Sequence, residues 1–157
     1  MQNKGENYEI DNTDLAILKC LQENASMPYT EVGKKVFVSS GTVHVRMRKM
    51  EEMGIVKGST LVIDYSKLGY DVYAFLGIYL QKSDLYESVV EQLKQVNEIL
   101  SLNYTTGNYS IFAKIICKDT KHLMEVLSGK IQKIQGIERT ETFISLEESL
   151  NRPYGLI

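Results

Sequence analysis

The 157-residue sequence has only two cysteines, only two histidines and no long apolar run. No segment approaches the roughly 20 consecutive apolar residues that a membrane helix requires, and the polar start MQNKGENYEIDN contains no apolar core of a signal peptide. We therefore expect a cytoplasmic protein without a membrane partner. Cys20 and Cys117 lie far apart within apolar patterns, so we interpret both as buried side chains and not as a disulfide or a metal pair.

The scarcity of histidine and cysteine also limits the chemistry that the chain can perform. His44 and His122 belong to no i, i+4 metal pair, to no Cys-x-x-Cys motif and to no nucleophile elbow. We expect no metal site, no cofactor and no enzymatic activity.

The sequence does contain enough apolar residues for a packed core, and its charge is unevenly distributed. Hydrophobic residues make up 43% of the chain, which excludes a disordered protein and allows one domain or two small ones. The formal net charge is −2, but residues 34–57 carry six cations against two acids. A basic cluster is often only a solvated face, so its meaning depends on the secondary structure around it.

The first third of the chain predicts three helices. The first begins at the capping residue Asp11 and runs to about Gln22, with leucines at helical spacing, namely Leu15, Leu18 and Leu21. A short second helix follows, with Thr30 as its cap. Ser39 caps a third helix, which ends at Gly54 and has an apolar stripe formed by Val43, Met47 and Met50.

The opposite face of this third helix is small at its start and cationic further along. A helix that enters the major groove of DNA needs this pattern, because small residues allow close approach and cationic side chains reach bases and phosphates. Arg46 lies to one side of this face. The second and third helices, joined by a tight turn, predict a helix-turn-helix. Its candidate DNA-binding residues are Lys34, Lys35, Ser39, Ser40, Gly41, Thr42, His44, Val45, Arg46, Arg48 and Lys49.

Residues 55–58 and 61–63 suggest a small β-hairpin, which would form the wing of a winged helix-turn-helix. The alternative is a plain three-helix domain whose basic face is merely solvated, because single helix-turn-helix patterns produce false matches.

The rest of the chain predicts strand–helix–strand–strand–helix–strand after a polar connector at residues 64–72. The first strand, Tyr73–Leu80, is apolar on both faces, which predicts a helix layer on one face and a second subunit on the other. Helices over 85–96 and 123–134, the latter ended by Gly136, alternate with strands over 99–105, 111–117 and 137–146. This order predicts an α+β fold whose second part is the ferredoxin-like arrangement, one antiparallel sheet with two helices on one face.

Four motifs, IDNTDLAILKCLQEN, VFVSSGTVHVRMRKMEEMGIV, TTGNYSIFAKI and GIERTETFISLEE, occur in an order and spacing that resemble the leucine-responsive regulator/AsnC (feast/famine) family of prokaryotic transcription factors. The resemblance implies a winged helix-turn-helix DNA-binding domain over residues 1–63, a linker over 64–72 and a ferredoxin-like effector-binding and oligomerisation domain over 73–157. It also implies double-stranded DNA as a partner, dimers or higher homo-oligomers assembled through the sheets, and small effectors, commonly amino acids, at the interface between effector domains.

Two departures from the family pattern concern turns. The turn of the helix-turn-helix usually holds a glycine where this chain has Phe37, so we expect a rearranged turn if that position needs a positive φ. The effector-domain turn usually reads Gly-x-Tyr/Phe-Asp, and here it ends in Ser110. A serine keeps a hydrogen-bonding group but removes the carboxylate that could meet an ammonium group.

The resemblance places the effector near this turn, with the candidate residues Tyr104, Gly107, Asn108, Tyr109, Ser110 and Phe143. Without an acid in the turn we expect weak or no binding of free α-amino acids and a neutral or anionic ligand, unless Glu141 from a neighbouring strand substitutes. The alternative is that these residues serve only packing and the turn.

The predicted function is that of a sequence-specific DNA-binding transcriptional regulator, modulated by a small molecule. Two other classes stay open. One is a tetrapyrrole decarboxylase of haem biosynthesis, because a few relatives of this architecture have that activity. The other is a ligand-binding assembly protein that does not use DNA, against which the basic third helix argues.

Overall fold

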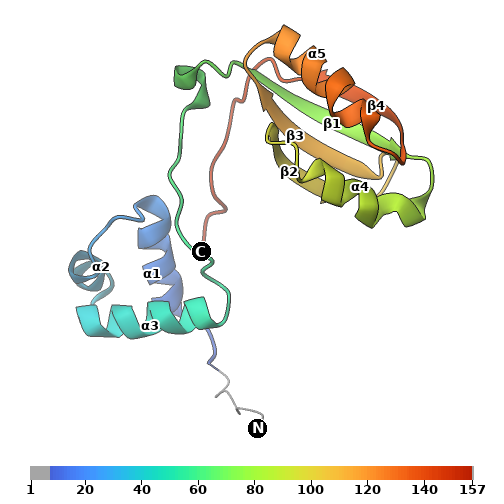
Figure 1. The fold of residues 1–157 in the computed structure, drawn as a ribbon. Coiled ribbons are helices and arrows are strands. Elements are labelled where there is room, and N and C mark those ends of the chain that lie inside the picture. The colour runs from blue at the N-terminus through green and yellow to red at the C-terminus, as the bar shows by residue number, and fades with distance from the viewer. Residues whose placement is uncertain (1–7, 157) are drawn as a thin grey trace. The chain divides into compact units, whose positions relative to one another are not determined.

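The computed structural model describes residues 8–156. The chain divides into two compact units, coloured from blue to red along the sequence in Figure 1. Unit 1 contains the residues up to Val62 together with the segment from Leu150, and unit 2 contains Ile63–Ser149. Each unit has its own cluster of buried apolar side chains.

Unit 1 is built from three helices, α1 (Asn12–Glu23), α2 (Tyr29–Val36) and α3 (Ser40–Glu52). The predicted stripe of α3 is confirmed, because Val43 and Met50 are fully buried and Met47 is nearly so. In α1 the fully buried apolar residue is Ile17, whereas the leucines predicted to form its stripe are only half-buried. Burying such side chains contributes about 1.5–3 kcal/mol each, so this cluster fixes which face of α3 remains outside.

Local hydrogen bonds set where these helices begin. The Asp11 carboxylate accepts the N–H of Asp14 while the Asp14 carboxylate accepts the N–H of Asp11, which is a reciprocal capping box at the start of α1. Ser39 Oγ accepts the N–H three residues further on at 3.0 Å, as predicted for α3. The prediction that Thr30 caps α2 is wrong: this helix begins at Tyr29, directly after a proline that makes no side-chain cap.

The helix α3 ends at Glu52, and the predicted stop residue Gly54 follows directly after the cap. Gly54 takes a φ of +72°, and the N–H of Ile55 donates to the carbonyl of Met50 at 2.9 Å. This is the Schellman arrangement, which satisfies carbonyl groups that the last helical turn leaves open.

The predicted β-hairpin after α3 is not formed in this chain. Residues 55–63 contain no strand, and Leu61 and Val62 are 83% and 100% exposed. A two-stranded ribbon is marginal in water unless its apolar side chains pack on another element. These two side chains bury almost nothing, so they give the ribbon no such support.

Unit 2 contains a four-stranded antiparallel sheet in the order β2-β3-β1-β4. Its elements along the chain are β1 (Val72–Leu80), α4 (Tyr86–Leu93), β2 (Ile99–Tyr104), β3 (Ile111–Cys117), α5 (Thr120–Gly129) and β4 (Ile137–Ile144). The predicted ferredoxin-like arrangement is confirmed. The helix α5 is shorter than predicted, because it stops at Gly129, a poor helix former, and a single 3₁₀ turn at Ile131–Lys133 continues the apolar pattern.

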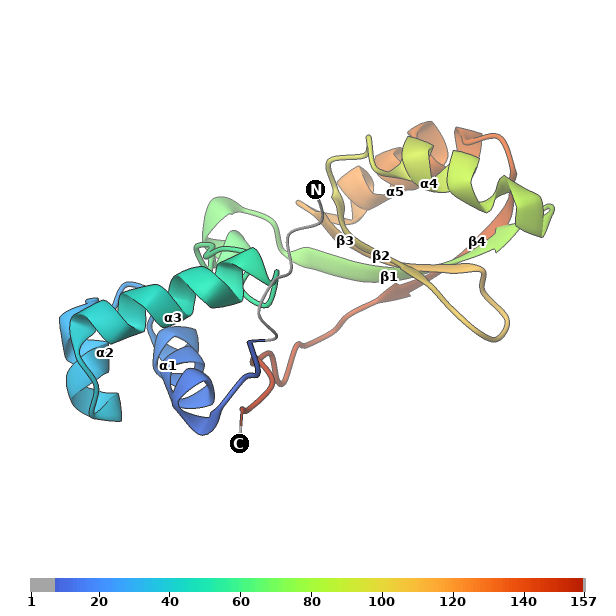
Figure 2. The ribbon, with the colours of Figure 1, turned by 90° about the horizontal axis from the view of Figure 1, so that it is seen from below.

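Both helices cover the same face of the sheet, as Figure 2 shows. Leu76 and Ile78 of β1 are fully buried on this side, in one cluster with Leu93 of α4 and Val126 of α5. Cys117 belongs to the same cluster, and burial raises the pKa of its thiol to about 11. It therefore acts as a small core side chain, in line with the interpretation from its apolar surroundings.

The other face of the sheet stays uncovered within residues 63–149, as Figure 2 shows. Aromatic side chains gather on this face. Phe75 stacks on Phe112 with 5.9 Å between ring centroids, and Tyr109 contacts the rings of Tyr79 at 5.1 Å and Phe143 at 6.3 Å. We call this surface the aromatic face, formed by Tyr73, Phe75, Tyr79, Tyr109, Phe112 and Phe143.

Residues 8–156 contain neither a membrane span nor a metal cluster. No helix in this range is long and apolar enough to cross a bilayer. No three acidic, histidine or cysteine side chains in this range are grouped so that they could hold a metal ion.

Candidate nucleic-acid interface and ligand site

The turn between α2 and α3 sets the start of α3. Gly33 permits a close approach there, because a Cβ on this residue would lie 2.6 Å from the carbonyl oxygen of Val38. The N–H groups of Phe37 and Val38 both donate to the carbonyl of Gly33. Phe37 itself lies in the left-handed region, with φ 59° and ψ 40°. The expected rearrangement of the turn is therefore wrong: the chain keeps a left-handed turn and places a phenylalanine in it.

All but one of the residues predicted to contact DNA are accessible on α2 and α3. The ring of His44 is held by that of Tyr29 at 5.6 Å between centroids, and Val45 is 57% exposed. We call this surface the DNA face, formed by the exposed Lys34, Lys35, Ser39, Ser40, Gly41, His44, Val45, Arg48 and Lys49 and the half-buried Thr42.

Within residues 8–156, the cations of the DNA face on α3 have only weak partners. Arg48 Nε donates to Glu52 at 2.9 Å, and both side chains are exposed. Lys49 Nζ lies 4.6 Å from the ring centroid of Tyr8. Exposed i, i+4 ion pairs and exposed cation–π contacts contribute little in water, so a phosphate can replace these partners at small cost.

Arg46 occupies a different environment from its neighbours on α3. Its Nη1 donates to Asp11 at 2.8 Å, to Asp14 at 2.9 Å and to the hydroxyl of Tyr8 at 3.1 Å. Asp14 is fully buried, and the Tyr8 hydroxyl donates to it at 2.6 Å. The two carboxylates raise the pKa of Arg46. Its guanidinium joins α3 to the start of α1, which distinguishes Arg46 from the exposed cations with which the prediction grouped it.

At the predicted effector turn, Tyr109 lies across the strand β1 at Gly77, where any Cβ would overlap its ring. Its hydroxyl donates to Glu141 at 2.8 Å, the hydroxyl of Tyr79 donates to Glu141 at 3.1 Å, and Arg139 donates at 2.8 Å. The hydrogen bond from Tyr109, followed by that from Tyr79, lowers the pKa of Glu141. An ionised carboxylate therefore stands beside the turn, although the turn itself contains no acid.

The structure does not bring all the predicted effector residues together. Tyr104 is 67% exposed and contacts the ring of Tyr86 from α4, on the side of the sheet that the helices cover. Tyr109 and Phe143 lie on the opposite, aromatic face. Ser110 donates its N–H to the strand β1 at 3.0 Å, while the exposed Gly107 and Asn108 form the tip of the turn.

Sequence reasoning did not predict the ion pair between Arg46 and Asp14, nor the contacts of Tyr109 with Gly77 and Glu141. Gly77 carried a usable signal, because a glycine inside an apolar strand often marks the close approach of another group. The pair of Arg46 and Asp14 carried none, since the two residues are 32 positions apart and no local pattern connects them. The sequence offers Glu141 only as a substitute acid, because its contact with Tyr109 likewise spans 32 positions.

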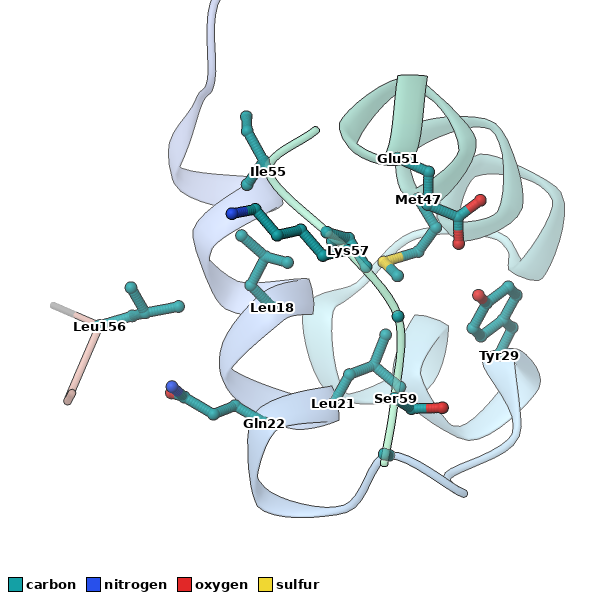
Figure 3. A pocket seen from close by; sticks show the side chains of 13 residues that line it. Leu18, Leu21, Gln22, Tyr29, Met47, Glu51, Ile55, Lys57, Ser59 and Leu156 are labelled. Carbon is teal, nitrogen blue, oxygen red and sulfur yellow. The ribbon is translucent and has the colours of Figure 1, made fainter. Parts of the chain in front are cut away.

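Unit 1 also contains an open groove of about 500 Å³ between α1, α3 and the segment that follows α3 (Figure 3). Leu18 and Leu21 of α1 and Met47 of α3 line it, together with Ile55. Glu51, Lys57 and Leu156 are among the other lining residues, and none of the residues of the DNA face belongs to the lining. The groove is therefore separate from the predicted DNA contacts.

Comparison with known protein families assigns both parts of the chain. Residues 10–57 match the winged helix-turn-helix DNA-binding family, and residues 73–154 match the Lrp/AsnC ligand binding domain.

Curated relatives match nearly the full length. The chain is 45% identical to the regulatory protein AsnC of Haemophilus influenzae, with 92% of this chain and 97% of that protein covered. It is 44% identical to the regulatory protein AsnC of Escherichia coli K12, with 94% and 97% covered. It is 35% identical to the HTH-type transcriptional regulator LrpA of Pyrococcus horikoshii, with 88% and 98% covered.

Solved structures agree with these matches. The structure of E. coli AsnC has a TM-score of 0.89 at 41% identity and covers 94% of this chain and 99% of that chain. A transcriptional regulator from Neisseria meningitidis, solved as a complex with L-Met, has a TM-score of 0.87 at 21% identity with 92% and 94% covered, which shows the same fold. These relatives are named as regulators and not as enzymes. The chain belongs to the Lrp/AsnC family of transcriptional regulators.

Proposed function

We propose that this regulator reads its operator with α3 in the major groove of double-stranded DNA. The observation that supports this most strongly is the DNA face, which is small and hydroxyl-bearing where α3 begins and cationic further along. Residues 34–50 contain five cations and no acid. Small groups let a helix approach base edges, and cations add the phosphate attraction that supplies most of non-specific affinity.

The proposed domain boundaries and functions follow the two matched families. Residues 1–63 act as the DNA-binding domain, residues 64–72 as a linker, and residues 73–157 as the effector-binding and oligomerisation domain, apart from the segment from Leu150, which belongs to unit 1. The matches at residues 10–57 and 73–154 support this division. We place the protein in the cytoplasm, because the DNA that it reads lies there.

The proposed assembly is at least a homodimer formed through the aromatic face. Half-exposed aromatic side chains that gather on one uncovered sheet face mark an interaction surface. A two-fold dimer would also present two α3 helices to a pseudo-palindromic operator, with the half-sites roughly one helical turn apart.

The proposed effector is a small molecule with an amino group, and Glu141 is the acid that meets it. The expectation of weak amino-acid binding rested on the missing carboxylate of the turn. Glu141 supplies a carboxylate 2.8 Å from the hydroxyl of Tyr109, and its pKa is lowered. The L-Met complex of the meningococcal relative supports the same class of ligand.

A thermal-shift screen of the twenty amino acids tests the effector proposal. We expect at least one of them to raise the melting temperature of the wild type, and Glu141→Gln to abolish that shift. Glu147→Gln, an exposed acid just beyond β4, is the matched control and should keep the shift. A screen without any stabilising amino acid, or a shift that survives in Glu141→Gln, would contradict the role given to Glu141.

The DNA proposal is tested by measuring operator affinity over a range of salt concentrations, after sequencing of the genomic DNA that the protein captures. Arg48→Ala should cost about 1–3 kcal/mol if the side chain contacts a base. Lys34→Ala should weaken all sequences alike and lower the slope of log affinity against log salt by about 1.

Lys133→Ala, an exposed lysine of unit 2, is the control for a change of charge alone and should alter neither quantity. Binding that ignores Arg48 and shows no dependence on salt rules out α3 as the DNA-binding element.

A further inference from the structure

Phe37 combines two unfavourable features, a strained backbone and an exposed apolar side chain. Among residues 8–156 it is the only residue other than glycine with a positive φ, a region that bulky side chains rarely adopt. Its side chain is 94% exposed, although it is fully apolar. A strained residue of this kind persists only where its surroundings or its function require it.

The backbone of the turn requires the left-handed conformation but does not require the phenyl ring. The turn is held by the two N–H groups that donate to the carbonyl of Gly33 and by the Ser39 cap. Gly33 itself cannot carry a Cβ at this point. A glycine at position 37 would satisfy the same hydrogen bonds with less strain, so the ring contributes nothing to the turn.

In the sequence, Phe37 lies between two sets of residues that belong to the DNA face. Lys34 and Lys35 lie exposed in the last turn of α2, just before it. Ser39 and Ser40, also exposed, open α3 just after it. A partner that covers both sets covers Phe37 as well, and the positive charge of this stretch favours an anionic partner.

We propose that Phe37 is a specificity-determining DNA contact, which packs against the 5-methyl group of a thymine at the edge of the major groove. This inference rests on the proposed function of α3. A phenyl ring is one of the apolar groups that recognise this methyl group. Contact with DNA removes the exposed apolar surface from water and thereby offsets the strain that the isolated chain carries.

The experiment combines a variant of the protein with a variant of the operator. Phe37→Gly should bind the operator about tenfold more weakly than the wild type, which corresponds to about 1.4 kcal/mol. Replacing one particular thymine by deoxyuridine, which removes only the methyl group, should cost the wild type a similar factor and should cost Phe37→Gly nothing. Because the contact is apolar, the salt slope should not change.

Two controls separate this role from a structural one. Phe37→Gly should melt at a higher temperature than the wild type, so weaker binding cannot come from misfolding. Leu146→Gly removes another exposed apolar side chain, in unit 2, and should leave affinity unchanged.

If Phe37→Gly binds as tightly as the wild type while Arg48→Ala does not, the inference about Phe37 is wrong and the proposed function stands. The inference is equally wrong if every deoxyuridine operator affects the wild type and Phe37→Gly to the same extent. A wild type that binds no DNA contradicts both the inference and the proposed function.

Discussion

At the scale of single residues, the cations of α3 have two different tasks. Arg48 and Lys49 are exposed with weak partners, whereas Arg46 is held by Asp11 and the fully buried Asp14. One terminal nitrogen of the Arg46 guanidinium, Nη1, contacts both carboxylates, at 2.8 Å and 2.9 Å. One short basic stretch therefore contains both a structural ion pair and candidate DNA contacts, and spacing along the helix does not distinguish them.

Removing Arg46 should destabilise unit 1 strongly, because Asp14 would keep a buried charge without its partner. We expect Arg46→Ala to lower the free energy of unfolding by about 3 kcal/mol, measured by urea denaturation. Arg46→Lys keeps the charge but carries it on a stem of different length and shape, so its stability should fall between those of Arg46→Ala and the wild type.

Arg48→Ala is the matched control, because it removes the same kind of side chain from the same helix two positions further on. It should change the free energy of unfolding by less than about 0.5 kcal/mol. Equal effects of the two alanine variants would show that the contact between Arg46 and Asp14 does not stabilise the fold.

At the scale of elements, β1 connects the core of unit 2 with the predicted effector turn. Its buried side is formed by Ala74, Leu76 and Ile78, and its other side leaves room for Tyr109 only because residue 77 is a glycine. The glycine at position 77 of β1 thus allows the turn that contains Tyr109 to lie against this strand.

Gly77→Ala should push the Tyr109 ring off β1, because the added methyl group would occupy its place. We expect a loss of about 1–3 kcal/mol in the free energy of unfolding. The pKa of Glu141 should also rise toward its ordinary value, because the hydrogen bond from Tyr109 that lowers it is lost. NMR titration of the carboxylate measures this second effect.

Gly129→Ala is the matched control, because a Cβ at that position in α5 meets open space. If Gly77→Ala leaves both the stability and the Glu141 titration unchanged, Tyr109 is not held by the shape of β1.

Most elements could be predicted from the sequence because their signals are local. The stripe of α3, its Ser39 cap and its end before Gly54 depend on residues within one helix, and all three predictions are confirmed. The alternation in β1 predicted two apolar faces, but which face the helices cover depends on packing with distant segments.

The errors arise where a local preference competes with packing or with a neighbour. Residues 55–63 have the composition of a hairpin, and Val56 packs on the buried cluster of unit 1, but Leu61 and Val62 stay exposed. Thr30 is a good capping residue, yet the helix begins before it, at Tyr29. Phe37 adopts the left-handed conformation that usually favours glycine, because the surrounding hydrogen bonds fix the backbone there.

At the scale of the whole molecule, the aromatic face is the surface on which the proposed assembly depends. The alternation of β1 places Phe75 and Leu76 on opposite faces, and the structure shows which face the helices cover: Leu76 is fully buried under them, and Phe75 lies on the aromatic face. A charge placed at each position therefore has a different consequence.

Phe75→Asp should dissociate the proposed dimer while leaving the helical content largely intact, because an unpaired charge in such an interface costs several kcal/mol. Leu76→Asp should instead unfold unit 2. Sedimentation velocity and circular dichroism measure the two outcomes. A wild type that sediments as a monomer at micromolar concentration would end the proposal of a dimer through this face.

The most direct test of α3 as the DNA-reading element is dimethyl sulfate footprinting of the protein on its operator. The reagent methylates N7 of guanine, which faces the major groove, and N3 of adenine, which faces the minor groove. We predict that the wild type protects guanine N7 in two tracts about 10 base pairs apart, and that Arg48→Ala loses protection in both tracts at equal occupancy. Protection confined to adenine N3, or a guanine pattern that Arg48→Ala leaves unchanged, would contradict the placement of α3 in the major groove.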